Sequence, residues 1–245
     1  MKSILSLTPN RRAAVRLVFF PYAGGNAWHI LNWARDFPAG VELLGVRYPE
    51  AAEAGSHSAQ SIAKGIFEDV VRYTDTPLIF FGYSLGALIA FEVCSELARA
   101  GIEMPAHLVV AAARAPGLAR TRPPISDLPE AELIEELRRY RGTPEVILRD
   151  QSVLDLLLPT IRAELAIAER YRLTEAVPLR CPLSAISGSH DELAAPSDIA
   201  AWHAHTTGPF DFVPLEGGHF FLHEQPQTVI AIIRRLTDRF HRDEK

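Results

Sequence analysis

The chain has 245 residues, of which 48% are hydrophobic, and its formal net charge is -5 at pH 7. This length and composition supply one continuous hydrophobic core, and they exclude a disordered chain and a small disulfide-stapled domain. The acidic balance argues against a nucleic-acid binder, which would normally be basic. We therefore expect a single domain over residues 1–245 that binds no nucleic acid.

Cysteine usage and hydropathy indicate the cellular compartment of the protein. Cys94 and Cys181 lie in or beside apolar stretches and predict reduced core residues. Residues 1–9 contain too short an apolar run for a signal peptide. The uncharged run 76–91 has 16 residues, which is short of a membrane span. We expect a cytoplasmic monomer that contacts no membrane.

Short apolar runs alternate with helical patterns along most of the chain. Six runs rich in Val, Ile, Leu or Phe predict strands at Arg16–Phe20, Val41–Tyr48, Pro77–Phe81, His107–Ala113, Leu183–Ser187 and Phe210–Leu215. Helical patterns between them cover Ser58–Tyr73, Leu85–Ala100, Ser197–Thr206 and Gln225–Phe240. This alternation predicts an α/β fold with a mostly parallel sheet and helices on both faces.

Residues 116–178 interrupt the alternation with an all-helical segment. It predicts helices at Leu128–Arg141, with Ser126 or Asp127 as cap and Gly142 after the end, at Pro144–Arg149, and at Ser152–Tyr171 with an interruption at Pro159. An apolar stripe runs along these helices at Leu133, Leu137, Ile147, Leu154, Leu157, Leu158, Ile161, Leu165 and Ile167. We interpret the segment as a helical lid over the carboxyl edge of the sheet. The alternative is that the stripe only anchors extra helices to the core.

The clearest chemical motif is the run from Gly82 to Gly86, Gly-Tyr-Ser-Leu-Gly, which follows a predicted strand and opens a predicted helix. This context is that of a nucleophile elbow, in which a serine on a tight turn exposes its hydroxyl and flanking glycines permit close backbone approach. The helix N-terminus adds free N–H groups where an oxyanion would form. We predict that Ser84 is a catalytic nucleophile.

A serine hydroxyl needs a base, and the base needs a carboxylate to fix its tautomer. Elbows of this type order their triad as Ser, then Asp or Glu, then His. His219 lies between the last predicted strand and the last predicted helix, so we predict it as the base, with His223 as its rival. The loop after the preceding strand offers Asp191 as the acid.

Two other carboxylates remain as alternatives for the acid. Glu192 adjoins Asp191, and Asp198 stands in the first turn of a predicted helix, where a solvated side chain is the more ordinary role. For the oxyanion hole, we predict the backbone N–H groups of Leu85 and Ala23. Ala23 precedes Gly24-Gly25 after the first predicted strand, and such a pair also marks plain turns.

Metal and nucleotide sites have little support in the sequence. His219 and His223 have helical ligand spacing but lack the glutamate of an HExxH motif. Two histidines at 203 and 205 would point apart on a helix. With no phosphate-binding glycine pattern either, we expect neither a metal ion nor a cofactor.

Several further motifs extend along nearly the whole chain. They are Phe20 to Gly25, Trp33, Tyr48-Pro49, Gly82 to Gly86, Arg114 to Pro116, Leu158-Pro159 with Arg162 to Glu164, Trp202, Thr206 to Phe210, and Gly217 to Leu222. In these residues the chain resembles the type II thioesterases that accompany nonribosomal peptide and polyketide synthases. The resemblance implies an α/β-hydrolase fold with a helical lid. It also implies hydrolysis of acyl or aminoacyl groups from the phosphopantetheine arm of carrier domains.

The chain departs from that family at two places. Tyr83 and Leu85 stand where the family often has His and Met, and Pro49-Glu50-Ala51 stands where it usually has Pro-Gly-Arg. These departures affect substrate preference and docking rather than the triad, because residue 85 contributes only its backbone N–H.

Triad chemistry alone does not separate a thioester from an oxygen ester, since both give an acyl-serine. The alternatives are therefore a small-molecule esterase or an acyltransferase, and, in another class, a non-catalytic protein that holds a carrier domain. Arg114, Arg120 and Arg122 flank the entry to the insertion. They form a hypothetical contact for the phosphate of the arm or an acidic carrier surface, with a solvated basic loop as the plainer alternative.

Overall fold

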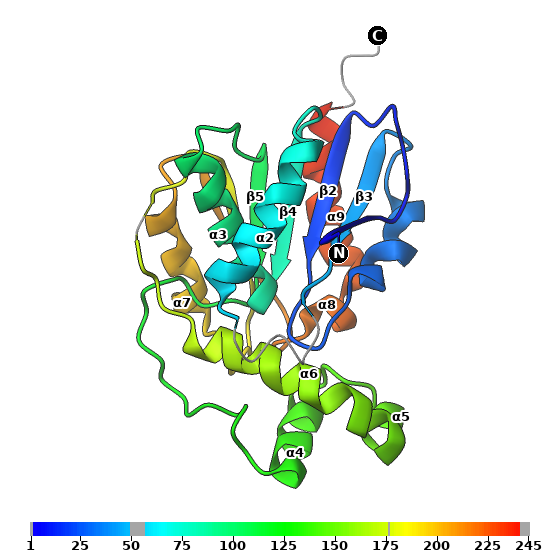
Figure 1. Ribbon diagram of the computed structural model, residues 1–245, viewed down its shortest axis with the longest axis vertical. Helices are drawn as coiled ribbons and strands as arrows, with labels where there is room; N and C mark the ends of the chain where they lie inside the picture. Colours follow the sequence, from blue (N-terminus) through cyan, green and yellow to red (C-terminus); the bar gives the residue numbers. More distant parts are fainter. Residues whose placement is uncertain (1, 50–56, 176, 241–245) are drawn as a thin grey trace.

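The computed structural model describes residues 2–49, 57–175 and 177–240. Its centre is a seven-stranded sheet in the order β1-β3-β2-β4-β5-β6-β7 (Figure 1). The strands are β1 Ile4–Ser6, β2 Val15–Phe20, β3 Val41–Val46, β4 Leu78–Tyr83, β5 His107–Ala111, β6 Leu183–Gly188 and β7 Phe210–Leu215. Strands β2 to β7 pair in parallel and β1 pairs antiparallel with β3. The predicted mostly parallel α/β sheet is confirmed.

The strand boundaries differ from the prediction where backbone pairing outweighs residue type. Strand β4 continues through Gly82 to Tyr83 because Gly82 pairs with Phe20 and Tyr83 pairs with Ala111. This extension carries the strand directly to Ser84. Strand β1 was not predicted, because its three residues are too few for a recognisable alternation.

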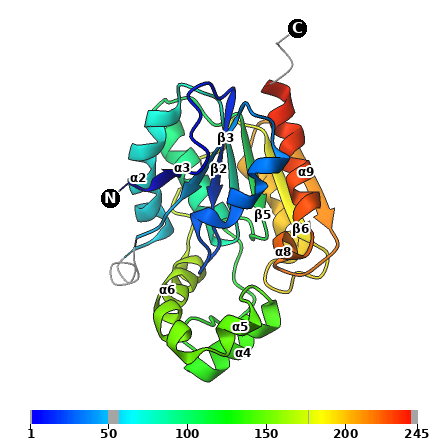
Figure 2. The same cartoon turned by 90° about the vertical axis from the view of Figure 1, so that its right-hand side faces the viewer.

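Helices cover both faces of the sheet, as predicted. They are η1 Ala27–Asp36, α2 Ala59–Val70, η2 Val71–Tyr73, α3 Leu85–Arg99, α7 Pro196–Ala200, η3 Ala201–His205, α8 Phe221–Glu224, α9 Pro226–Thr237 and η4 Asp238–Phe240. Helices α2 and α3 pack on one face, where they form one buried apolar cluster with the strands. On the other face η1 and α9 share a second cluster (Figure 2).

The segment 116–178 contains α4 Glu130–Tyr140, α5 Glu145–Leu148 and α6 Gln151–Arg170. These helices lie beyond the carboxyl ends of the parallel strands, as the lid interpretation requires (Figures 1 and 2). They bury a small apolar cluster of their own, made of Leu133, Leu148, Leu154 and Leu158. Of the predicted stripe, Ile167 joins the main core, whereas Leu157 is 38% exposed.

Three details of the lid prediction were wrong. Helix α6 is continuous over 20 residues rather than interrupted at Pro159. The carbonyl of Asp155 loses its donor there, but Asp155 and Pro159 both lie on the exposed side, where water can take its place.

Helix α4 begins after Pro129 without a side-chain cap, because Ser126 is buried and donates its hydroxyl to Glu169 instead. Its end is formed by Arg141 in the left-handed region, with φ 57°, rather than by Gly142. Gly142 is needed for packing, since a Cβ there would lie 2.3 Å from the ring of Phe220.

Candidate active site

Ser84 stands on the turn between β4 and α3 with φ 52° and ψ -117°, a conformation that non-glycine residues rarely adopt. Its N–H donates to the carbonyl of Ala111 at 2.8 Å. A Cβ on Gly86 would lie 2.0 Å from the carbonyl oxygen of Phe20, and one on Gly82 would lie 2.5 Å from the Cα of Ala87. Both glycines are therefore required by close backbone contacts, and these contacts hold the strained serine in place.

Ser84, His219 and Asp191 come together although they are far apart in sequence. His219 Nε2 lies 3.1 Å from Ser84 Oγ, and His219 Nδ1 lies 2.9 Å and 3.1 Å from the two carboxylate oxygens of Asp191. Asp191 Oδ1 also accepts the N–H groups of Leu193 at 2.8 Å and Ala194 at 2.9 Å. The acid and the histidine are only 5% and 7% exposed, so the hydrogen bonds between these two residues are shielded from water.

Tyr83 is a residue of this site that sequence reasoning missed as a contributor. Its buried hydroxyl donates to the backbone carbonyl of His219 at 2.6 Å and accepts the N–H of Leu222 at 3.3 Å. Burial raises the pKa of Tyr83, so the hydroxyl stays protonated and remains a donor. The only signal was its position beside Ser84, where a buried polar tip needs a nearby partner.

The alternative candidates lie elsewhere. His223 Nε2 is 3.0 Å from the hydroxyl of Tyr22, and Glu192 pairs with Arg122 and Arg139 on the lid side. Asp198 forms an ion pair with Arg114 at 2.8 Å. Glu50 and Ala51 of the predicted departure lie outside the described residues.

Burial also lowers the pKa of the histidines beside the Tyr22 hydroxyl. The pKa of His223 falls for this reason. The pKa of His29 falls to about 4 because of burial and, secondly, because of the positive charge that His223 carries once it is protonated at lower pH. This pair is therefore neutral at pH 7.

The loop after β2 carries the predicted second oxyanion donor, Ala23. The carbonyls of Phe20 and Pro21 lie against Gly86, which places this loop beside the first turn of α3. A hydrogen bond of 2.8 Å from Gly25 N–H to the carbonyl of Tyr22 closes the turn around Ala23. Leu85 is the first residue of α3, so its N–H has no partner within the helix.

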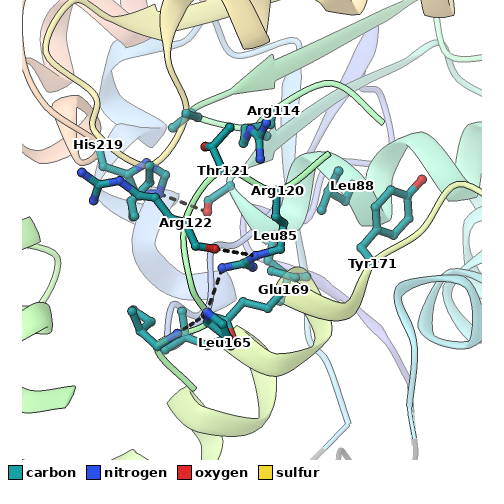
Figure 3. A pocket seen from close by; sticks show the side chains of 18 of the residues that line it. Leu85, Leu88, Arg114, Arg120, Thr121, Arg122, Leu165, Glu169, Tyr171 and His219 are labelled. Atoms are coloured by element: carbon teal, nitrogen blue, oxygen red, sulfur yellow. Dashed lines mark hydrogen bonds and ion pairs between the residues drawn. The ribbon is translucent and has the colours of Figure 1, made fainter. Parts of the chain in front are cut away.

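A cavity of about 1160 Å³ opens onto Ser84 and His219 beneath the lid. Figure 3 shows its apolar wall, with Leu85 and Leu88 from α3 on one side and Leu165 from α6 on another. Polar side chains from the segment entering the lid, from α4 and from the end of α6 also line it. A molecule with an apolar acyl group could therefore reach the serine from the lid side.

The thioesterase domain family matches residues 15–237. The chain belongs to this family. It is 31% identical to the gramicidin S biosynthesis protein GrsT of Aneurinibacillus migulanus, over 95% of this chain and 92% of that protein. It is 36% identical to thioesterase PikA5 of Streptomyces venezuelae, over 89% and 79% of the two chains. The structure of the type II thioesterase BorB from the borrelidin biosynthetic cluster superposes with a TM-score of 0.87 at 32% identity, covering 97% of this chain and 98% of that one.

Membership makes the chain a thioester hydrolase with the α/β-hydrolase fold. It also resolves one alternative left open by the sequence, since a purely non-catalytic carrier-binding role does not fit a thioesterase.

Two further features are absent from the described residues. None of the described helices combines the length and hydrophobicity needed to cross a bilayer. Nowhere in residues 2–49, 57–175 and 177–240 do three His, Cys, Asp or Glu side chains gather as a metal site would require.

The three arginines at the entry of the thioesterase lid line the cavity, and each already has partners (Figure 3). Arg114 contacts Asp198 and the carbonyl of Ala119. Arg120 donates to two nearby carbonyls, and Arg122 pairs with Glu192 at 3.3 Å. These contacts hold the segment that enters the lid, and contact with a carrier domain stays a prediction.

Proposed function

We propose that this thioesterase hydrolyses acyl or aminoacyl thioesters on the phosphopantetheine arm of synthase carrier domains, releasing stalled or incorrect groups. The observation that carries the proposal is the hydrogen-bonded series Asp191, His219 and Ser84 facing a large cavity beneath a helical lid. The names of the relatives, which include a type II thioesterase and an antibiotic biosynthesis protein, support the substrate class.

In the proposed reaction, Ser84 Oγ attacks the thioester carbonyl while His219 Nε2 takes the hydroxyl proton. Asp191 keeps the other ring N–H in place and stabilises the imidazolium that forms. The N–H groups of Leu85 and Ala23 donate to the oxyanion of the tetrahedral intermediate. As the intermediate collapses, the C–S bond breaks and the departing thiolate receives the proton from His219.

Water completes the cycle. His219 removes a proton from a water molecule that attacks the acyl group on Ser84, and the carboxylic acid leaves as the serine hydroxyl is restored. Because water is the only co-substrate, we propose that no cofactor or metal ion takes part. Activity unchanged by EDTA would agree with this, and loss that added metal restores would refute it.

The partner in this proposal is an acyl or peptidyl carrier domain that approaches from the lid side, because its arm must reach Ser84 through the cavity. We propose that the thioesterase acts as a monomer in the cytoplasm. Light scattering of the purified chain at several concentrations would test the monomer directly.

The discriminating experiment compares three substrates that carry the same acyl group: a loaded carrier protein, coenzyme A and a p-nitrophenyl ester. We expect kcat/KM to be highest for the carrier and to fall at least about 1000-fold in Ser84→Ala. The matched control is Ser189→Ala, since Ser189 is an exposed serine in the Asp191 loop. An ester that reacts as well as the carrier would refute the carrier assignment, and activity retained in Ser84→Ala would refute the serine mechanism.

A further inference from the structure

Two side chains of α6 contact the loop that follows β2. Ile161 and Glu164 are three residues apart and so share one face of the helix. Glu164 Oε2 accepts the N–H of Gly24 at 2.6 Å. A Cβ added to Gly24, whose φ is +76°, would lie 2.7 Å from Ile161 Cγ1. The lid helix therefore touches the backbone of the residue directly after Ala23.

The same loop is also held by Tyr48, which lies two residues after the end of β3. Tyr48, which is 8% exposed, donates its hydroxyl to the carbonyl of Pro21 at 2.8 Å. The short stretch between Pro21 and Gly24 is thus fixed at both ends by side-chain hydrogen bonds. One of them comes from the segment after β3 and the other comes from α6.

A carboxylate is a costly choice for this position. Glu164 is only 5% exposed, and among the described residues no Lys, Arg or His lies within ion-pair distance of it. Burial raises its pKa to about 7, and the bond from Gly24 N–H is the one contact found to oppose that rise in the described part of the chain. Burying an unpaired acid costs stability, whereas an apolar side chain of the same volume would pack without this penalty.

We propose that Glu164 is a positioning residue that couples the lid to the oxyanion loop. Its carboxylate accepts the N–H of the peptide that follows Ala23 and so fixes the backbone on the C-terminal side of Ala23. The N–H of Ala23 belongs to the preceding peptide, and it points correctly only when α6 is seated on the loop and holds Ala23 in place. The inference rests on the proposed oxyanion role of Ala23. It does not depend on which thioester the enzyme prefers.

Two substitutions separate the hydrogen bond from packing. Glu164→Met keeps the side-chain volume but removes the acceptor, and Glu164→Gln keeps an acceptor oxygen without the charge. For Glu164→Met we expect kcat to fall about 10- to 100-fold, less than the loss of a whole oxyanion donor, with KM within about twofold. For Glu164→Gln we expect kcat within about fivefold of wild type.

The test uses a p-nitrophenyl ester, so that failure of the carrier assignment would not affect it. Affinity for an alkylboronic acid, which forms a tetrahedral adduct with a serine, should weaken in Glu164→Met by about the same factor as kcat/KM. The control is Glu42→Gln, which alters a buried carboxylate at the amino end of β3. Its kcat should stay at the wild-type value.

Several outcomes would overturn the proposal. One is a Glu164→Met enzyme that melts at a lower temperature but keeps its kcat and its boronate affinity. Another is a rise in KM alone, which would make Glu164 part of substrate binding. Equal losses in Glu164→Met and Glu164→Gln would show that the charge matters and the acceptor oxygen does not. If Ser84→Ala hydrolysed the ester normally, the proposed function itself would fail, and that result is separate from these.

Discussion

The base of the site and the lid above it are built in different ways. At the base, backbone contacts set the geometry. Ser84 directly follows β4 where that strand pairs with β5, and the close contacts at Gly82 and Gly86 leave no room for a side chain. The lid instead rests on a cluster of four buried leucines and on ion pairs with exposed members.

This difference indicates how the enzyme divides its tasks. Bond-making groups need positions accurate to fractions of an ångström, and a parallel sheet provides them. A cover that admits substrates requires less precision and has a smaller core of its own. The contact between Glu164 and Gly24 is one of the buried places where the two regions meet, and Ile167 in the main core is another.

The largest expected effect comes from disturbing the base without changing its shape. Asp191→Asn should lower kcat about 1000- to 10,000-fold with little change in KM, because the amide no longer selects the productive tautomer of His219. Steady-state kinetics on a p-nitrophenyl ester measures this. A loss of less than about tenfold would show that Asp191 is not the orienting acid.

A core truncation in each region tests their separate stability. Leu133→Ala in the lid and Leu17→Ala in β2 both remove a fully buried side chain and should each cost about 2–5 kcal/mol. The lid variant should become sensitive to proteolysis within 116–178 while hydrogen exchange in the sheet stays slow. The strand variant should lower the melting temperature of the whole domain. Identical behaviour of the two variants would contradict two regions of different stability.

A buried histidine in the sheet, His107, should make the stability of the fold depend on pH. Burial, aided by the charge of Arg239, lowers the pKa of His107 to about 4. The unfolded chain therefore takes up a proton at this residue between about pH 6.5 and pH 4 while the folded chain does not, so stability falls as pH falls through that window.

In His107→Gln the decrease in melting temperature from about pH 7 to about pH 5 should be smaller than in wild type. Part of the decrease should remain, because the pKa values of His29 and His205 are also lowered by burial. An unchanged slope in the variant would show that His107 does not contribute.

The smallest expected effect concerns the exposed ion pairs between the lid and the Asp191 loop. Glu192 is 51% exposed on its side chain and pairs with Arg122 and Arg139. Glu192→Gln should cost less than about 1 kcal/mol and leave kcat within about twofold, with the difference vanishing near 0.5 M salt. A large loss of activity at high salt would mean that these pairs do more than tether the lid.

Sequence predicted the base of the site better than the lid for a physical reason. The elbow is a local pattern, and the loops after parallel strands meet at one edge of the sheet. The sequence could therefore predict that Ser84, Asp191 and His219 lie close together. The bond from Tyr83 to the backbone of His219 spans 136 residues and leaves no local signal.

The lid errors arose from applying local rules where tertiary contacts decide. Pro159 suggested a break, but its exposed position lets α6 continue. Ser126 suggested a cap, but Glu169 takes its hydroxyl. Glu164 stood out only as part of a family motif, since its partner on Gly24 is 140 residues away.

The most direct test of the central claim is to look for the covalent intermediate. The enzyme would be mixed with an acyl-loaded carrier protein, quenched within one turnover, digested and analysed by mass spectrometry. The account predicts that the peptide containing Gly82 to Gly86 carries the acyl mass on Ser84, and that Ser84→Ala forms neither adduct nor product. Product release by Ser84→Ala, or an acyl adduct on another residue, would contradict it.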